Sequence, residues 1–382
     1  MTNHPKSTPV EMLDALIRIP SVSSVSNRPV VEFAIQNLQY AGWHVRMLLY
    51  MDPNGVEKIN LLAMPSAQDL DDPNVDLALV CHTDTVPYSS TWEHATQPYV
   101  RDGYLHGCGA CDVKGFLACV LCACAGVPAQ QIFSRVCVVL TADEEIGCIG
   151  AARLAASQAI RPRCVVIGEP TSLHPARIGK GYCLAEIRVH GKEAHSAHPA
   201  QGISAIYGAA RWIAAIERFA SELKHDINTL LEPPYTTLNI GRIEGGTAKN
   251  IVPGECTFLL EWRPIPGQPA DFVSKTIEAM ACDLRREDPT FHYTIDVLRQ
   301  QDGFATPEES SFVQMLTRWT QQSAIAIPFS TEAPHFAKLA EEVVVLGPGD
   351  MRTAHSEREC ISLQELDACT ACLANLLTHP IP

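Results

Sequence analysis

The chain has 382 residues and a formal net charge of −14, and 46% of its residues are hydrophobic and 19% charged. This composition is typical of a folded globular protein and excludes a disordered or fibrous one. The acidic balance argues against a nucleic-acid partner, because phosphate binding depends on Lys and Arg. A chain of this length is expected to form two domains.

The sequence also favours a cytoplasmic protein without a membrane partner. No stretch approaches the ~20 apolar residues of a membrane span, and residues 1–23 lack the apolar core of a signal peptide. Many of the fifteen cysteines lie inside apolar segments, where free cysteine acts as a small buried hydrophobe. The pairs Cys108/Cys111 and Cys119/Cys122 imitate a zinc pattern, but the gap between them is too short for a structural zinc site.

In chain order, the first half alternates helical and strand patterns, which indicates an α/β domain with a mainly parallel sheet. Helices are expected at 9–18, 29–40, 116–125 and 149–158, and strands at 43–49, 58–63, 76–81, 136–141 and 164–167. The same alternation resumes near the C-terminus, with a helix at 310–322, a strand at 343–346 and a helix at 363–377.

Between these parts the pattern changes. Strands are expected at 181–189, 236–243, 255–262 and 291–298, and helices at 203–223 and 272–286. This order is β-α-β-β-α-β, a two-layer, ferredoxin-like unit. We therefore predict a discontinuous catalytic domain, residues 1–176 and 300–382, with an inserted dimerisation or lid domain at 177–299. The strand at 181–189 is expected at the edge of the inserted sheet.

Seven acidic and histidine residues recur at the ends of apolar strands or in glycine-rich turns. They are His82, Asp84, Asp112, Glu144, Glu145, Glu169 and His355. In an open α/β sheet the carboxyl ends of the strands face one crevice, where ligands bind. The set therefore predicts one site, and its imidazole and carboxylate groups suit zinc, cobalt or manganese.

His82 and Asp84 lie two residues apart at a strand end, so their side chains project to the same side. A carboxylate in this position can hold the second ring nitrogen of a metal-bound histidine. Asp112 lies among glycines that let the backbone approach a ligand closely. The alternative for Asp112 is a helix N-cap.

The adjacent glutamates Glu144 and Glu145 repel each other, so a buried pair needs a cation or a proton. One of them can bind metal while the other accepts a proton from a water that two metals activate. Taken alone, they could be two exposed acids, Glu169 a capping acid and His355 a surface histidine. The combination of all seven favours the dinuclear site.

The ordered motifs resemble the M20 family of dinuclear metallopeptidases and deacylases. The matching stretches are 81–87 (CHTDTVP), 107–115 (GCGACDVKG), 141–147 (TADEEIG), 168–171 (GEPT), 191–196 (GKEAHS) and 245–253 (GGTAKNIVP). The resemblance implies two divalent ions per subunit, Zn²⁺ or Co²⁺. It implies that His82 and Glu169 bind one ion, Glu145 and His355 bind the other, and Asp112 bridges them. Glu144 would be the general base, and Asp84 would orient its neighbours.

Within that family the chain is most similar to deacetylases of N-acetyl-L-ornithine, in the stretches 245–250, 261–267, 331–334 and 346–349. Two departures are Arg358-Glu359, where many members have Asp-Glu, and Cys108, where an arginine is often found. The expected substrate is a small N-acyl amino acid. Deacetylation of N-acetylcitrulline, desuccinylation of succinyl-diaminopimelate and broader aminoacylase activity remain alternatives.

The resemblance also implies a homodimer through the inserted domain, in which His195 reaches the partner's site and stabilises the oxyanion. The alternative is a surface histidine. Arg263 is expected to bind the substrate α-carboxylate, since its planar fork matches a carboxylate, although it could pair with Glu261 or Glu255 instead. Asn250 is expected to add a hydrogen bond to the substrate. Glu332 is expected near the mouth of the site, where it would bind the side-chain amine.

Two other classes of protein are disfavoured. A non-catalytic, metal-dependent binding protein would not need Glu144, yet a glutamate is present there together with the ligands. A metal-free α/β hydrolase is disfavoured because the chain contains no Gly-x-Ser-x-Gly motif.

Overall fold

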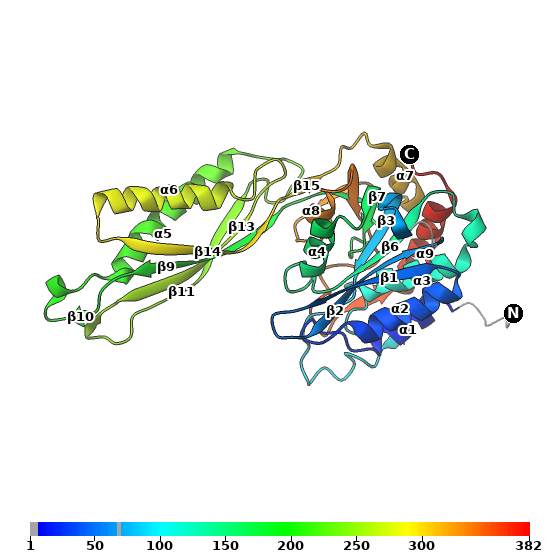
Figure 1. The fold of residues 1–382 in the computed structure, drawn as a ribbon, viewed down its shortest axis with the longest axis horizontal. Helices are drawn as coiled ribbons and strands as arrows, with labels where there is room; N and C mark the ends of the chain where they lie inside the picture. The colour runs from blue at the N-terminus through cyan, green and yellow to red at the C-terminus, as the bar shows by residue number, and fades with distance from the viewer. Residues whose placement is uncertain (1–6, 67–69) are drawn as a thin grey trace. The chain divides into compact units, whose positions relative to one another are not determined.

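The computed structural model describes residues 7–66 and 70–382, and it divides into two compact units (Figure 1). The first unit comprises Met1–Arg177, Thr306–Ile325 and Thr331–Pro382, and the second comprises Ile178–Ala305 and Ala326–Ser330. The second unit thus takes in residues 300–305 and 326–330, which the sequence prediction placed in the catalytic domain, whereas Arg177, predicted in the inserted domain, belongs to the first unit. Residues 1–6, where the segment examined for a signal peptide begins, lie outside the described residues.

The first unit is built on a large sheet with the strand order β1-β2-β6-β3-β7-β17. Its strands are β1 (His44–Met51), β2 (Glu57–Met64), β3 (Asn74–His82), β6 (Val136–Thr141), β7 (Arg161–Ile167) and β17 (Glu342–Val345). The four strands β6, β3, β7 and β17 are parallel, whereas β2 runs antiparallel to both of its neighbours, β1 and β6. All six residues of β6 are buried, which is typical of a parallel strand covered on both faces. The predicted α/β class with a mainly parallel sheet is confirmed.

Helices pack around this sheet (Figure 1). They are α1 (Pro9–Ile17), α2 (Arg28–Tyr40), α3 (Lys114–Gly126), α4 (Ile149–Ser157), α7 (Ser311–Thr320), α8 (Ala333–Phe336) and α9 (Leu363–Thr378). The apolar helix α3 lies at the centre of one layer and contacts α1, α2 and α9, while α4 contacts α8. Among the described residues, no helix is both long and apolar enough to span a bilayer.

The remaining strands of this part of the chain are short. A small sheet with the order β18-β5-β4 joins β4 (Tyr99–Arg101), β5 (Tyr104–His106) and β18 (Cys360–Ser362). Three further strands lie where the chain passes from one unit to the other, namely β8 (Ala176–Gly179), β15 (Phe304–Ala305) and β16 (Ile325–Ile327). These short strands have too few residues for their periodicity to stand out in the sequence.

The second unit has the predicted β-α-β-β-α-β order. Its main elements are β9 (Tyr182–His190), α5 (Ala205–Glu222), β11 (Thr237–Gly245), β13 (Glu255–Arg263), α6 (Phe272–Glu287) and β14 (His292–Gln301). A two-stranded ribbon of β10 (Ala194–His195) and β12 (Ile251–Val252) accompanies them. Residues in β9 alternate between buried and partly exposed, because one face of the sheet packs against the two helices.

The prediction that residues 181–189 form an edge strand is wrong. The sheet order is β11-β13-β9-β14, so β9 pairs on both sides, and β11 and β14 form the edges. The alternating pattern of β9 reports a covered face and an open face of the sheet. It carries no information about which neighbours occupy the two sides of the strand, and this is why the sequence could not place it.

Candidate metal centre

Three neighbouring parallel strands of the first unit end in the predicted site residues. His82 is the last residue of β3, Glu144 and Glu145 follow β6, and Glu169 follows β7. Because these strands are adjacent and parallel, their carboxyl ends bring together side chains that lie up to 87 residues apart in the chain. Gly168 permits this packing, since a Cβ atom there would lie 2.1 Å from the ring of Phe116.

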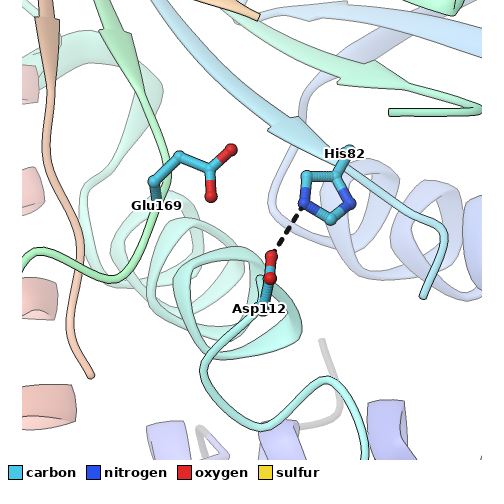
Figure 2. A group of neighbouring side chains, drawn as sticks. All are labelled: His82, Asp112 and Glu169. Atoms are coloured by element: carbon cyan, nitrogen blue, oxygen red, sulfur yellow. Dashed lines mark hydrogen bonds and ion pairs between the residues drawn. The ribbon is translucent and has the colours of Figure 1, made fainter. Parts of the chain in front are cut away.

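His82, Asp112 and Glu169 form the first group of possible metal ligands, and Figure 2 shows their side chains converging. Each residue offers one ligand atom, and these atoms lie within 4.8 Å of one another. His82 Nε2 lies 3.1 Å from Asp112 Oδ1, and all three residues are buried. Such a compact set of one imidazole and two carboxylates suits a divalent cation.

Asp112, Glu145 and His355 form a second group that meets the same 4.8 Å limit. His355 Nε2 lies 3.1 Å from Asp112 Oδ2 and 3.2 Å from Glu145 Oε2. Asp112 therefore belongs to both groups and presents a different oxygen to each histidine. The His355 side chain is 49% exposed and that of His82 only 1%, so the second group is the more open to solvent.

Glu144 belongs to neither ligand group but lies beside both. Its Oε1 accepts a hydrogen bond from the Cys148 thiol at 3.2 Å. Its backbone N–H donates to Asp84 Oδ1 at 3.1 Å, and the N–H of Glu145 donates to Asp84 Oδ2 at 3.3 Å. Asp84 thus holds the turn that carries both glutamates. The Glu144 carboxylate takes part in neither ligand group.

Two expectations for individual residues need correction. His82 Nδ1 lies 3.0 Å from the main-chain carbonyl oxygen of Asp84, whereas the carboxylate is 3.7 Å away. Asp84 therefore orients His82 through its backbone, because its carboxylate is bound to the Glu144–Glu145 turn. The N-cap alternative for Asp112 is also wrong, since α3 begins at Lys114 and its N-cap is Val113.

Sequence reasoning missed a buried carboxylate that supports Asp112. Glu359 accepts hydrogen bonds from the backbone N–H groups of Gly109, Cys111 and Asp112 at 3.0, 3.1 and 3.1 Å. These bonds hold the glycine-rich turn, in which Gly109 adopts a φ of +78°. In the sequence Glu359 stood out only because Arg358-Glu359 departs from the family pattern. Its contact with the turn of Asp112 could not be predicted, because the two residues are 247 positions apart.

The electrostatics of the cluster fit a bound cation. Burial raises the pKa of Glu144 to about 8, and it also raises the pKa values of Glu145 and Glu169. Burial works to raise the pKa of Asp112 too, but the hydrogen bonds from the two histidines outweigh it and hold that pKa low. Hydrogen bonds to Asp112 and Glu145 raise the pKa of His355 to about 10. Positive charge would relieve this excess of buried negative charge.

Two further observations support the fit. Within the described part of the chain, the buried Oε1 of Glu145 has no hydrogen-bond partner, although buried polar atoms normally have one. Both ligand groups contain only imidazole and carboxylate ligands, and all fifteen cysteines are free. Cys119 and Cys122 lie within α3, and neither of the two ligand groups found among the described residues contains a cysteine.

The predicted substrate residues of the second unit lie on or beside its strands. Arg263 is the last residue of β13, and its guanidinium lies over the Tyr182 ring. It pairs with Glu261 at 2.9 Å, which is the alternative that the sequence left open for it. Asn250 is exposed and lies directly before β12. His195 is exposed in β10, and its Nδ1 accepts a hydrogen bond from the backbone N–H of Ala197 at 3.0 Å.

The expectation that Glu332 lies at the mouth of the site is wrong. Its exposed fraction is 0%, and within the described residues its two carboxylate oxygens have no hydrogen-bond partner. Burial raises its pKa to about 7, and its charge raises the pKa of Glu144 and Glu169. Glu332 therefore belongs to the buried surroundings of the metal centre. The sequence could not show this, because polar residues before a short helix are usually exposed.

Comparisons with known proteins agree with this site. Residues 78–379 match the model of peptidase family M20/M25/M40. The chain is 41% identical over 368 residues to an acetylornithine deacetylase of Myxococcus xanthus, and 96% of each chain is covered. Its fold is similar to a tripeptidase of Staphylococcus aureus, with a TM-score of 0.75, 22% identity and 97% of each chain covered. It is also similar to a dinuclear metal-binding peptidase of Bacillus subtilis, with a TM-score of 0.64, 13% identity and 97% and 96% covered.

Proposed function

The chain belongs to peptidase family M20/M25/M40, and from this premise we propose that it removes the N2-acetyl group of N-acetyl-L-ornithine. The products are L-ornithine and acetate, so the reaction would serve arginine biosynthesis, and the many buried free cysteines suit the cytoplasm. The observation that carries the proposal is the pair of ligand groups that share Asp112, with Glu144 beside them. The 41% identity to an acetylornithine deacetylase supports the choice of substrate.

In this proposal His82, Asp112 and Glu169 hold one divalent ion, and Asp112, Glu145 and His355 hold the other, each Zn²⁺ or Co²⁺. When bound, such ions lower the pKa of an attacking water and offset negative charge that develops on the amide oxygen. The chain itself contributes the alignment, because Asp84 fixes both His82 and the turn of Glu144 and Glu145.

Glu144 is proposed to move the proton. Its carboxylate accepts a proton from the attacking water and delivers it to the leaving amine nitrogen as the amide C–N bond breaks. One of its oxygens is held by the Cys148 thiol, which restricts how the carboxylate turns. Burial raises the pKa of Glu144, which makes its carboxylate a stronger base toward the attacking water.

A substrate panel tests the proposed activity. The protein is purified with Co²⁺ or Zn²⁺, and kcat/KM is measured for N-acetylornithine, N-acetylcitrulline, succinyl-diaminopimelate and N-acetylmethionine. We expect N-acetylornithine to be preferred at least ~10-fold, which corresponds to about 1.4 kcal/mol of differential transition-state binding. A preference for another member of the panel would assign that activity instead.

We also propose a homodimer formed through the second unit, in which His195 acts in the partner's site. Because Nδ1 of His195 accepts a hydrogen bond, the neutral ring carries its proton on Nε2 and can donate it to a developing oxyanion. His195→Ala should lower kcat about 10²–10³-fold, the typical cost of losing one such donor. His198→Ala is the control, since its ring lies 6.4 Å from that of His195. A fully active monomer in analytical ultracentrifugation would contradict the dimer.

Arg263 is proposed to bind the substrate α-carboxylate, with Asn250 adding a hydrogen bond. Arg263→Lys replaces a bidentate contact with a point contact, so kcat/KM for N-acetylornithine should fall at least ~10-fold. Arg299→Lys is a matched control, because Arg299 lies over the same Tyr182 ring. Unchanged kinetics together with a lower Tm would show that Arg263 has only a structural role, through contacts such as the pair with Glu261.

A further inference from the structure

A buried ion pair lies next to the turn that carries Glu144 and Glu145. Lys58 of β2 and Asp143 join through Nζ and Oδ1 at 2.6 Å, and each side chain is only 1% exposed. Burying two charges is costly, and apolar residues of similar volume often stabilise a fold as well or better. Stability alone therefore gives no reason for a charged pair at this position.

Lys58 is also connected to the same turn through hydrogen bonds that involve Ser23 and Asp84. Its Nζ also donates to the carbonyl oxygens of Ser23 at 2.5 Å and Val25 at 3.0 Å, so all three donors of the ammonium are used. The Ser23 hydroxyl in turn donates to Asp84 Oδ2 at 2.7 Å. Asp84 is the residue that accepts the backbone N–H groups of Glu144 and Glu145.

Asp143 is constrained from a further direction. Its Oδ2 accepts a hydrogen bond from the Tyr50 hydroxyl at 2.9 Å, and its backbone adopts a left-handed φ of +59°. The left-handed region is unfavourable for most residues, although Asp and Asn tolerate it better. The turn is therefore held by the Lys58–Asp143 pair on one side and by Lys58, Ser23 and Asp84 on the other.

We propose that the Lys58–Asp143 pair is a positioning device for the catalytic turn. It sets where the Glu144 carboxylate and the ligand Glu145 lie, and it does so through Asp143 and Asp84 without touching the substrate. The role assigned to Glu144 rests on the proposed function, whereas the effect on Glu145 concerns metal binding alone. The competing explanation is a pair that contributes only to folding.

The double variant Lys58→Met/Asp143→Asn separates the two explanations. It removes both charges together, so no unpaired charge stays buried, and Asn tolerates the left-handed backbone. We expect a folded protein that binds one of its two Co²⁺ ions about 10-fold more weakly in a chelator competition. With both sites saturated, kcat should fall about 10–100-fold with KM changed less than ~3-fold, the range seen when groups behind metal ligands are altered.

Two controls accompany this experiment. Lys58→Arg keeps the charge and should retain more Co²⁺ affinity and kcat than the double variant. Arg28→Met removes a partly exposed ion pair at 2.6 Å between Arg28 and Glu57, the residue before Lys58 on β2. Because this pair is exposed, its loss should change neither the Co²⁺ affinity nor kcat. A double variant with the Co²⁺ affinity and kcat of the unaltered protein would overturn the proposal.

If the double variant does not fold, Asp143→Asn alone takes its place, since it removes the negative charge of the pair and Asn tolerates the left-handed backbone. Weaker Co²⁺ binding with an unchanged Tm supports the proposal, and unchanged binding overturns it. The proposed function fails separately. If the unaltered protein hydrolyses no N-acyl amino acid while the variants still bind Co²⁺ more weakly, the positioning role stands and the assigned activity does not.

Discussion

Glu144→Ala should retain about two metal ions per active site while kcat falls about 10²–10⁴-fold, the usual contribution of a positioned general base. The reason is that Glu144 lies outside both ligand groups, whereas its backbone and carboxylate are held in place beside them. Substrate binding does not use the carboxylate, so KM should change little. Metal content by atomic emission and steady-state kinetics on the same sample measure both quantities.

Glu145→Ala is the matched comparison, because it removes the same group from the neighbouring residue. It should lose metal first, since Glu145 forms a ligand group with Asp112 and His355. Excess Co²⁺ should restore part of its activity but none of the activity of Glu144→Ala. If metal content instead falls together with activity in Glu144→Ala, the roles of the two glutamates are exchanged.

We expect Asp112→Asn to lose more bound metal than any other variant. Asp112 presents Oδ1 to His82 and Oδ2 to His355, each at 3.1 Å, and it belongs to both ligand groups. An amide offers one neutral oxygen in place of two charged ones, so both sites should weaken. We expect metal content below one ion per chain after dialysis and a loss of kcat/KM of at least ~10³-fold, because the transition state loses its cationic stabilisation.

Asp102→Asn is a suitable control for this experiment. Asp102 also lies in a turn, its side chain is 85% exposed, and it has no place in either ligand group. Metal content and kcat should therefore match the unaltered protein. If Asp112→Asn keeps one tightly bound ion and loses only the other, Asp112 serves one site and does not bridge two.

Periodicity and strand ends were enough to predict the class of fold and to single out the residues that form the two candidate ligand groups. The central strands β3, β6 and β7 contain continuous buried apolar runs because both faces of the sheet are covered there, and such runs can be recognised in the sequence. The ligands follow those strands directly. Since parallel neighbours end at one edge of the sheet, the positions of His82, Glu145 and Glu169 in the sequence already implied that they meet.

Long-range packing determined what the sequence could not. The neighbours of β9 depend on which strands pair, and an alternating pattern is the same at the edge and in the centre of a sheet. Glu332 is buried because of the elements packed around it, although its local sequence predicts exposure. Asp84 orients His82 with its carbonyl oxygen because its carboxylate is bound to a turn that begins 60 residues later.

The supports of the site also depend on contacts between distant parts of the chain. Glu359 meets the turn of Asp112 across 247 residues, and Lys58 meets Asp143 across 85. The candidate metal ligands were thus predictable from the sequence, because strand ends place them locally. The residues that hold them in position were decided only by the tertiary structure, because burial and hydrogen-bond partners arise once distant segments pack together.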